Sequence, residues 1–148
     1  MILSGGALTL PCIGVVIMNP EKLIELAKKA MDAAYAPYSG YKVGAALLCA
    51  DGTVYTGCNI ENAAFSPTVC AERTAVFKAV SEGHRDFSAM AICGGKEGNI
   101  TGFFPPCGVC RQVLREFCTH SFPVYLAGPD GQYRTRTLAE LLPDSFFL

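Results

Sequence analysis

Three cysteines in two short segments constrain this chain most, because a shared metal ion would force two distant parts of the sequence to meet. Cys70 lies at the predicted start of one helix, and Cys107 and Cys110 lie three residues apart at the predicted start of another. Residues three apart share a helix face, and helix N-termini favour thiolates. Three thiolates leave the fourth position of a tetrahedral zinc ion open to water, as a catalytic site requires. The pattern predicts one Zn²⁺ per chain.

Charged residues next to these ligands suggest chemistry as well as binding. Glu72, two residues after Cys70, is expected to reach the water in the open position and to carry protons as a general acid and base. Three thiolates give the centre a net negative formal charge, which weakens its power to acidify water. Arg73 and Arg111 flank the ligand segments and can hydrogen-bond the sulfurs. Arg73 is the better candidate because it follows Cys70 by three residues.

Two other interpretations of the cysteines compete with a catalytic site. A lone Cys-x-x-Cys also suits a redox dithiol or half of a structural zinc site. A structural four-sulfur site needs one more thiolate, from Cys58, Cys93 or Cys118, and none of these forms a second Cys-x-x-Cys pair. Cys-x-Glu followed by Pro-Cys-x-x-Cys is far more specific and is the signature of zinc-dependent nucleobase deaminases. A structural zinc module that binds a partner remains the alternative from another class.

The composition narrows the class of protein further. The chain has 148 residues, of which 51% are hydrophobic and 17% charged, so one domain with a real core is expected. A net charge of −1, with scattered Lys and Arg, is not the basic footprint of a nucleic-acid binder. We therefore expect a free small molecule as the partner, and no nucleic acid.

The first 17 residues are apolar but are interrupted by glycine and proline, and they carry no positively charged n-region. They fit neither an export signal nor a membrane span. We expect a cytoplasmic protein without membrane contact, in which clustered cysteines bind metal more often than they form disulfides. Residues 1–17 are interpreted as an appendage and residues 18–148 as a single deaminase domain. An extra strand, packed on the domain or at an oligomer contact, is the alternative for residues 1–17.

Periodicity and turn signals predict an α-β-β-α-β-α-β-β-α order. Asn19 and Pro20 form a helix start, and Asp51-Gly52 is a hairpin turn signal. The mixture of hairpins and crossovers predicts an α/β fold, a three-layer α/β/α sandwich with a five-stranded mixed sheet. The helices are expected at residues 20–36, 69–82, 107–120 and 138–142, and the strands at residues 41–50, 53–60, 87–94, 123–127 and 133–137.

The chain resembles the free-nucleoside cytidine deaminases, in their small homotetrameric form with three cysteine ligands. The resemblance runs from Leu23 to Phe146 and covers far more than the metal motifs. The matching segments are Ala36-Pro37-Tyr38-Ser39, Val43-Gly44-Ala45-Ala46-Leu47, Gly57-Cys58-Asn59-Ile60-Glu61-Asn62-Ala63, Cys70-Ala71-Glu72-Arg73-Thr74-Ala75, Pro106-Cys107-Gly108-Val109-Cys110-Arg111-Gln112 and Glu140-Leu141-Leu142-Pro143.

The resemblance implies an activity and a set of residues for it. The reaction would be hydrolytic deamination of cytidine and 2′-deoxycytidine to uridine and 2′-deoxyuridine, with release of ammonia, in pyrimidine salvage. Cys70, Cys107 and Cys110 would hold the zinc ion, and Glu72 would be the proton shuttle. The backbone N–H of Ala71 would contact the pyrimidine edge.

Five further positions would bind the nucleoside by the same resemblance. Asn59 and Glu61 would hold the ribose hydroxyls, which agrees with the common direction of residues two apart at a strand end; turn capping is their alternative role. Tyr41 stands where the family usually has Phe on the sugar side. Phe146 would stack on the base, and Phe65 would reach the site of a neighbouring subunit. For all three aromatic residues, plain packing is the alternative.

The chain departs from the family pattern at Pro105, and two other deaminase activities compete with cytidine deamination. Pro105 stands where Ser or Thr is usual, but proline keeps the backbone carbonyl that the family uses near the leaving amine. A deaminase of another aminated pyrimidine, such as a blasticidin-type nucleoside antibiotic, is disfavoured because the Asn59 and Glu61 pair is complete. A polynucleotide-editing enzyme is disfavoured by the near-neutral charge.

Overall fold

Helix α1 (Pro20–Met31) starts as its sequence predicts. The Asn19 side chain accepts a hydrogen bond from the backbone N–H of Glu21 at 2.8 Å, and Pro20 occupies the first turn.

The structure, a computed structural model, describes residues 17–148. The predicted appendage therefore lies outside the described residues, apart from Ile17. No helix within the described range is long and apolar enough to cross a membrane.

The first helix is shorter than the predicted range of 20–36. The helix ends at Met31, and Tyr35 instead forms a parallel bridge with Ile60. The backbone N–H of Tyr35 donates to the carbonyl of Asn59 at 3.0 Å, and the Tyr35 carbonyl accepts from Glu61 at 2.8 Å. Pairing with a distant segment therefore overrides the helical periodicity of the local sequence.

The strands form one mixed sheet with the order β2-β1-β3-β4-β5. The β3–β4 pair is parallel, and the other neighbouring pairs are antiparallel. The bounds of the last two strands agree with the predicted ranges, and the others differ by a few residues. The strands are β1 (Tyr41–Cys49), β2 (Val54–Cys58), β3 (Phe87–Lys96), β4 (Pro123–Ala127) and β5 (Tyr133–Thr137).

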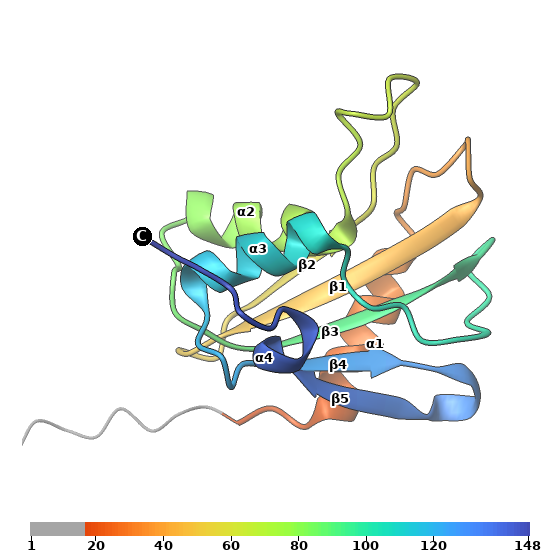
Figure 1. Ribbon diagram of the computed structural model, residues 1–148. Helices are drawn as coiled ribbons and strands as arrows, with labels where there is room; N and C mark the ends of the chain where they lie inside the picture. Colours follow the sequence, from red (N-terminus) through yellow and green to blue (C-terminus); the bar gives the residue numbers. More distant parts are fainter. Residues whose placement is uncertain (1–16) are drawn as a thin grey trace, which may run out of the picture.

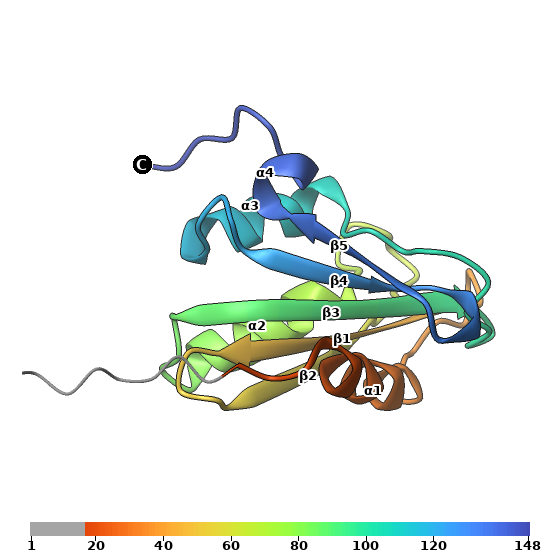
Figure 2. The same cartoon turned by 90° about the horizontal axis from the view of Figure 1, so that it is seen from below.

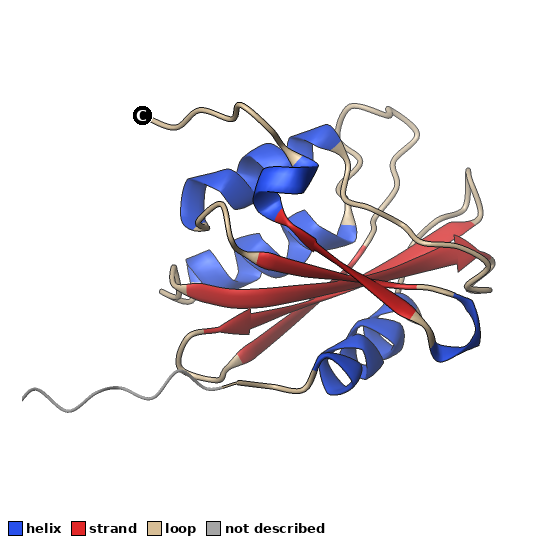
Figure 3. Ribbon diagram, turned by 60° about the horizontal axis from the view of Figure 1, so that its bottom comes forward, coloured by secondary structure: helices blue, strands red, loops and turns tan. Residues whose placement is uncertain are grey.

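Helices cover both faces of this sheet, as predicted for a three-layer sandwich. Helix α1 packs on one face, while α2 (Ala71–Ser81), α3 (Gly108–Phe117) and the short α4 (Leu138–Leu141) lie on the other (Figure 1). Seen from below, α1 stands in front of the strands and α2 behind them (Figure 2). A 3₁₀ turn, η1 (Pro129–Gly131), joins β4 to β5. Figure 3 shows the two longer helices of the upper layer running side by side over the sheet. The predicted fold class and element order are confirmed.

Two glycines let helices approach the sheet without an intervening side chain. A Cβ on Gly44 of β1 would lie 2.0 Å from the Ala27 carbonyl oxygen in α1. A Cβ on Gly57 of β2 would lie 2.4 Å from the Ala71 carbonyl oxygen and 2.5 Å from the Ala75 nitrogen in α2. The first turn of α2 therefore lies directly on β2.

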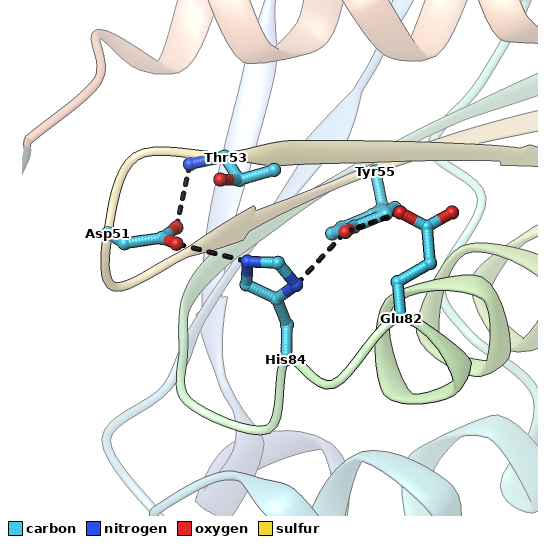
Figure 4. A network of polar contacts seen from close by, with 5 residues as sticks. All are labelled: Asp51, Thr53, Tyr55, Glu82 and His84. Carbon is cyan, nitrogen blue, oxygen red and sulfur yellow. Dashed lines mark hydrogen bonds and ion pairs between the residues drawn. The ribbon is translucent and has the colours of Figure 1, made fainter.

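A chain of polar contacts fastens the other end of α2 to the β1–β2 hairpin (Figure 4). The Tyr55 hydroxyl donates to Glu82 Oε2 at 2.9 Å and lies 3.0 Å from His84 Nδ1. His84 Nε2 lies 3.0 Å from Asp51 Oδ2, and Asp51 Oδ1 accepts from the Thr53 backbone N–H at 2.9 Å. Loss of solvent around the phenol raises the pKa of Tyr55 to about 12, so the hydroxyl keeps its proton at neutral pH. The helix is therefore held at both of its ends.

Substituting Gly57 by Ala should destabilise the fold, because the new methyl group meets backbone atoms that cannot move away cheaply. We expect the free energy of unfolding in urea to fall by about 1–3 kcal/mol, the usual cost of overpacking. Gly102→Ala is the matched control, since a Cβ there meets nothing within 4 Å. Equal stability of the two variants would contradict this account of the α2–β2 contact.

Candidate active site

Two helix starts bring three thiols together at one end of the upper layer. Cys70 caps α2, Cys107 caps α3, and Cys110 lies in the first turn of α3. Both helices begin on the same side of the molecule (Figure 1). The three Sγ atoms lie within 4.8 Å of one another, and those of Cys70 and Cys107 are 3.7 Å apart. The cysteines predicted as ligands therefore form one cluster.

The geometry of this cluster fits a tetrahedral zinc ion. Two sulfurs held at about 2.3 Å from such an ion stand roughly 3.8 Å apart, close to the 3.7 Å between Cys70 and Cys107. Neither capping cysteine makes a side-chain hydrogen bond to its own helix start, so both sulfurs are available as ligands. The positive ends of the two helices favour thiolates over thiols at this place.

The three thiols share their protons unequally. A hydrogen bond from the Cys110 thiol, assisted by Arg73 and Cys107, lowers the pKa of Cys70 to about 5. The same hydrogen bond raises the pKa of Cys110, which keeps its proton in the metal-free protein. Cys70 is therefore the first thiolate to form and a ready anchor for a cation.

Arg73 makes the contact that its spacing predicts. Its Nη2 atom lies 3.7 Å from Cys70 Sγ and donates to the Thr68 carbonyl at 3.3 Å. Arg111, the other arginine considered for this role, donates instead to the backbone carbonyls of Pro106 and Leu141. One positive charge thus directly faces the sulfur cluster from α2.

Glu72 lies beside the thiols and is 4% exposed. Its Oε2 atom is buried and has no hydrogen-bond partner among residues 17–148. Burial, with a contribution from the Cys70 thiolate, raises the pKa of Glu72 to about 7. A carboxyl group with this pKa and one oxygen free of partners can take up and release a proton near neutral pH.

A cavity of about 180 Å³ opens onto Cys70, Cys107 and Glu72. Its walls come from strand β1 and the loop before it, the loop after β2, the start of α2, strand β3 and the segment before α3. It is lined by Ser39, Tyr41, Val43, Asn59, Glu61, Thr68, Val69, Cys70, Glu72, Ile92, Phe104, Pro105 and Cys107. Three of the six residues predicted to bind the nucleoside, Tyr41, Asn59 and Glu61, therefore share one cavity with Cys70 and Cys107.

The polar pair Asn59 and Glu61 is already engaged by the protein. Asn59 Oδ1 accepts from the Val43 N–H, and its Nδ2 donates to the Tyr41 carbonyl, each at 2.8 Å. Both Glu61 carboxylate oxygens accept hydrogen bonds from the Tyr38–Ser39 segment, including one from the Ser39 hydroxyl, and these lower the pKa of Glu61. An amide nitrogen carries a second proton and each oxygen a further lone pair, so both side chains retain capacity for a ligand.

The predicted aromatic residues occupy three different environments. The Tyr41 ring lines the cavity and packs at 5.9 Å against Phe104. Phe65 is 80% exposed and lines a neighbouring hollow with Tyr38. Phe146 is 70% exposed and is not a lining residue, although its carbonyl accepts from Gln112. The structure therefore brings Tyr41 to the cavity and leaves Phe65 and Phe146 outside it.

Two contributors to the site were not identified from the sequence. Ser39 positions Glu61 through its backbone N–H and its hydroxyl, and the same hydroxyl accepts from the Tyr41 N–H at 3.0 Å. Phe104 forms part of the cavity wall. Ser39 lies in one of the motifs that carried the family resemblance, which was the available signal, whereas Phe104 lies in a loop without a local pattern. Ala71 is fully buried at the start of α2, between Cys70 and Glu72.

Comparisons with known proteins identify close relatives. The family model for the cytidine and deoxycytidylate deaminase zinc-binding region matches residues 18–126. A cytidine deaminase of Sporosarcina psychrophila is 56% identical over 129 residues, which cover 87% of this chain and 92% of the relative. The crystal structure of cytidine deaminase from Burkholderia pseudomallei superposes with a TM-score of 0.80 at 46% identity, and the match covers 87% of this chain and all of that one. That of Mycobacterium tuberculosis gives 0.76 at 39% identity, covering 89% of this chain and all of that one.

The low pKa of Cys70 predicts a specific reactivity in the metal-free protein. Alkylation of Cys70 by iodoacetamide, followed by mass spectrometry, should rise with pH at a midpoint well below that of an ordinary thiol. An Arg73→Ala variant should move this midpoint to higher pH, because it removes a hydrogen bond that stabilises the thiolate. Cys118, whose pKa burial raises to about 12, should remain unlabelled as an internal control. A Cys70 midpoint near that of an ordinary thiol would contradict the assignment.

Proposed function

This chain belongs to the family of cytidine and deoxycytidylate deaminases, and we propose that it hydrolyses cytidine and 2′-deoxycytidine to uridine and 2′-deoxyuridine with release of ammonia. The observation that carries this proposal is the buried Glu72 carboxyl, whose Oε2 atom has no hydrogen-bond partner among residues 17–148, beside three clustered thiols and in a cavity that Asn59 and Glu61 also line. The relatives named cytidine deaminase support cytidine as a substrate.

In this proposal Cys70, Cys107 and Cys110 hold one zinc ion per chain. The ion supplies Lewis-acid activation of the attacking water. Glu72 takes the first proton from that water and delivers it to N3 of the base, and it then takes the second proton from the new C4 hydroxyl and delivers it to the departing amine. A pKa raised to about 7 by burial suits both directions of transfer. Arg73 offsets part of the negative charge of the sulfurs from its place beside Cys70.

The opposite part of the cavity is proposed to select a free nucleoside. Asn59 and Glu61 hold the ribose hydroxyls with the lone pairs and the N–H that the fold leaves unused. The Ala71 N–H contacts the pyrimidine edge, and Tyr41 lines the sugar side. A blasticidin-type substrate is the weaker alternative, because a paired amide and carboxylate match a ribose diol.

A structural zinc module is less well supported than an enzyme. Cys58, Cys93 and Cys118, the candidate fourth ligands, are not part of the sulfur cluster, which within residues 17–148 contains three cysteines. Burial raises the pKa of the Cys93 and Cys118 thiols to about 11 and 12, which disfavours them as thiolate ligands. An open coordination position next to a proton carrier is typical of a catalytic site.

The cellular setting forms part of the same proposal. Residues 18–148 act as one deaminase domain in the cytoplasm, in pyrimidine salvage, and neither nucleic acid nor membrane is a partner. We propose a homotetramer, in which the exposed Phe65 reaches the site of a neighbouring subunit. Phe146 would complete the base contact if the C-terminal residues fold over the cavity in that assembly.

Replacing Glu72 by Gln tests the proposed function most directly. The amide preserves shape but cannot carry the proton, so kcat for cytidine should fall by at least about 10²–10⁴-fold. The zinc content should stay near one per chain, because the ligands are unchanged. Glu116→Gln removes one exposed carboxylate from α3 and should retain activity. Ultraviolet absorbance of cytidine and zinc analysis on the same sample provide the measurement. Near-normal turnover by Glu72→Gln would refute the role.

A Glu61→Ala variant distinguishes two roles of Glu61, binding of the ribose and support of the Tyr38–Ser39 segment. A hydrogen bond to a charged group contributes about 1.5–3 kcal/mol, so KM for cytidine should rise at least about tenfold. KM for 2′,3′-dideoxycytidine, which lacks both ring hydroxyls, should change much less. Ser39→Ala, which removes a brace but keeps the carboxylate, is the control for loop displacement. Equal losses for both substrates would show that Glu61 acts only through the loop.

A further inference from the structure

The segment that leads into Cys107 has almost no hydrogen bonds to the rest of the protein. Pro105 and Pro106 have no backbone N–H to donate. Between Thr101 and Pro106, the one hydrogen bond found within residues 17–148 ends on the Pro106 carbonyl. Its donor is Arg111 Nε, at 2.7 Å. The position of the residue before Cys107 therefore depends on this bond and on side-chain packing.

The other end of the same guanidinium group is anchored on α4. Arg111 Nη1 donates to the carbonyl of Leu141, the last residue of that helix. A helix leaves its final carbonyls without partners, and a basic side chain satisfies them favourably. Leu141 is itself 7% exposed, so Arg111 is bonded to a buried part of α4. Arg111 thus connects α3, the segment before Cys107 and α4.

We infer that Arg111 is a positioning residue for the metal centre. It acts through its hydrogen bond to the backbone carbonyl of Pro106 and not through a contact with the sulfurs. By holding the Pro106 carbonyl, it fixes Cys107 relative to Cys110, which lies next to Arg111 in α3. The inference rests on the proposed zinc site of these cysteines. A planar guanidinium donates in two directions at once, which a lysine ammonium cannot reproduce with the same geometry.

Arg115 provides a matched control on the same helix. It lies one turn beyond Arg111, is 8% exposed and donates to the Cys118 carbonyl at 3.0 Å and to Ser145 Oγ at 3.1 Å. Its guanidinium also stacks at 4.3 Å on the Phe147 ring. Arg115 therefore ties α3 to the C-terminal residues, much as Arg111 ties it to α4, but within residues 17–148 it forms no hydrogen bond with the segment before Cys107.

The test compares zinc release from the full-length, zinc-loaded wild type with release from Arg111→Ala, Arg111→Lys and Arg115→Ala. Each protein is mixed with an excess of a colorimetric chelator, at a temperature a fixed interval below its own Tm. Both Arg111 variants should release zinc at least about tenfold faster than the wild type, as for other residues that orient metal ligands. Arg115→Ala should release zinc at the wild-type rate. In cobalt-substituted protein, the thiolate absorption bands should shift in the Arg111 variants alone.

The outcomes separate this inference from the proposed function. Equal release rates for the Arg111 and Arg115 variants, with unchanged cobalt spectra, would overturn the positioning role. A wild type that holds no zinc would instead contradict the proposed metal site. If Arg111→Ala does not fold, the Arg111→Lys variant alone tests the inference. Lysine keeps the charge and most of the side-chain volume and loses only the ability to donate to the Pro106 and Leu141 carbonyls at the same time.

Discussion

The first turn of α2 can carry the chemistry of this protein because Gly57 lets it lie directly on β2. A single methyl group at residue 57 would come within 2.4 Å of the Ala71 carbonyl oxygen. This contact sets the height of Cys70 and Glu72 above the end of the sheet. The contacts of Tyr55 with Glu82 and His84 hold the far end of the same helix. A helix fixed at both ends presents its first residues with little freedom, which a metal site requires.

Neighbouring acidic groups in the site have pKa values displaced in opposite directions. The Cys70 thiol ionises easily because Cys110 and Arg73 donate hydrogen bonds to its sulfur, in the positive field of a helix start. The Glu72 carboxyl resists ionisation because it is buried beside the Cys70 sulfur. The same few residues therefore combine a thiol that ionises easily with a carboxyl that holds its proton more tightly than usual. Divergent pKa values in one cavity are typical of acid–base catalysis.

Several polar side chains of the site already form hydrogen bonds within the protein. Asn59 is held by the backbone of β1, and Glu61 by the Tyr38–Ser39 segment. Between them, Ile60 bridges Tyr35 on one side and Val69 on the other. This pairing holds Val69, the residue before Cys70, and the two candidates for ribose binding, Asn59 and Glu61, in one small hydrogen-bonded framework. Preorganised side chains lose little conformational freedom on binding, so the framework favours affinity for the ligand.

The sequence by itself determined the order of the elements and the fold class, and it singled out the three cysteines and Glu72 as candidate site residues, because these inferences depend on local periodicity, turn residues and short spacings. The bounds of β4 and β5 followed from the same local signals. Only the tertiary structure decided where α1 ends, what Ser39 and Arg111 hold, and that Phe146 stands outside the cavity. Each of these depends on contacts between segments far apart in the chain, such as Tyr35 with Ile60 or Arg111 with Leu141. No local pattern encodes such contacts, because they form only when the packed sheet and helices bring both partners together.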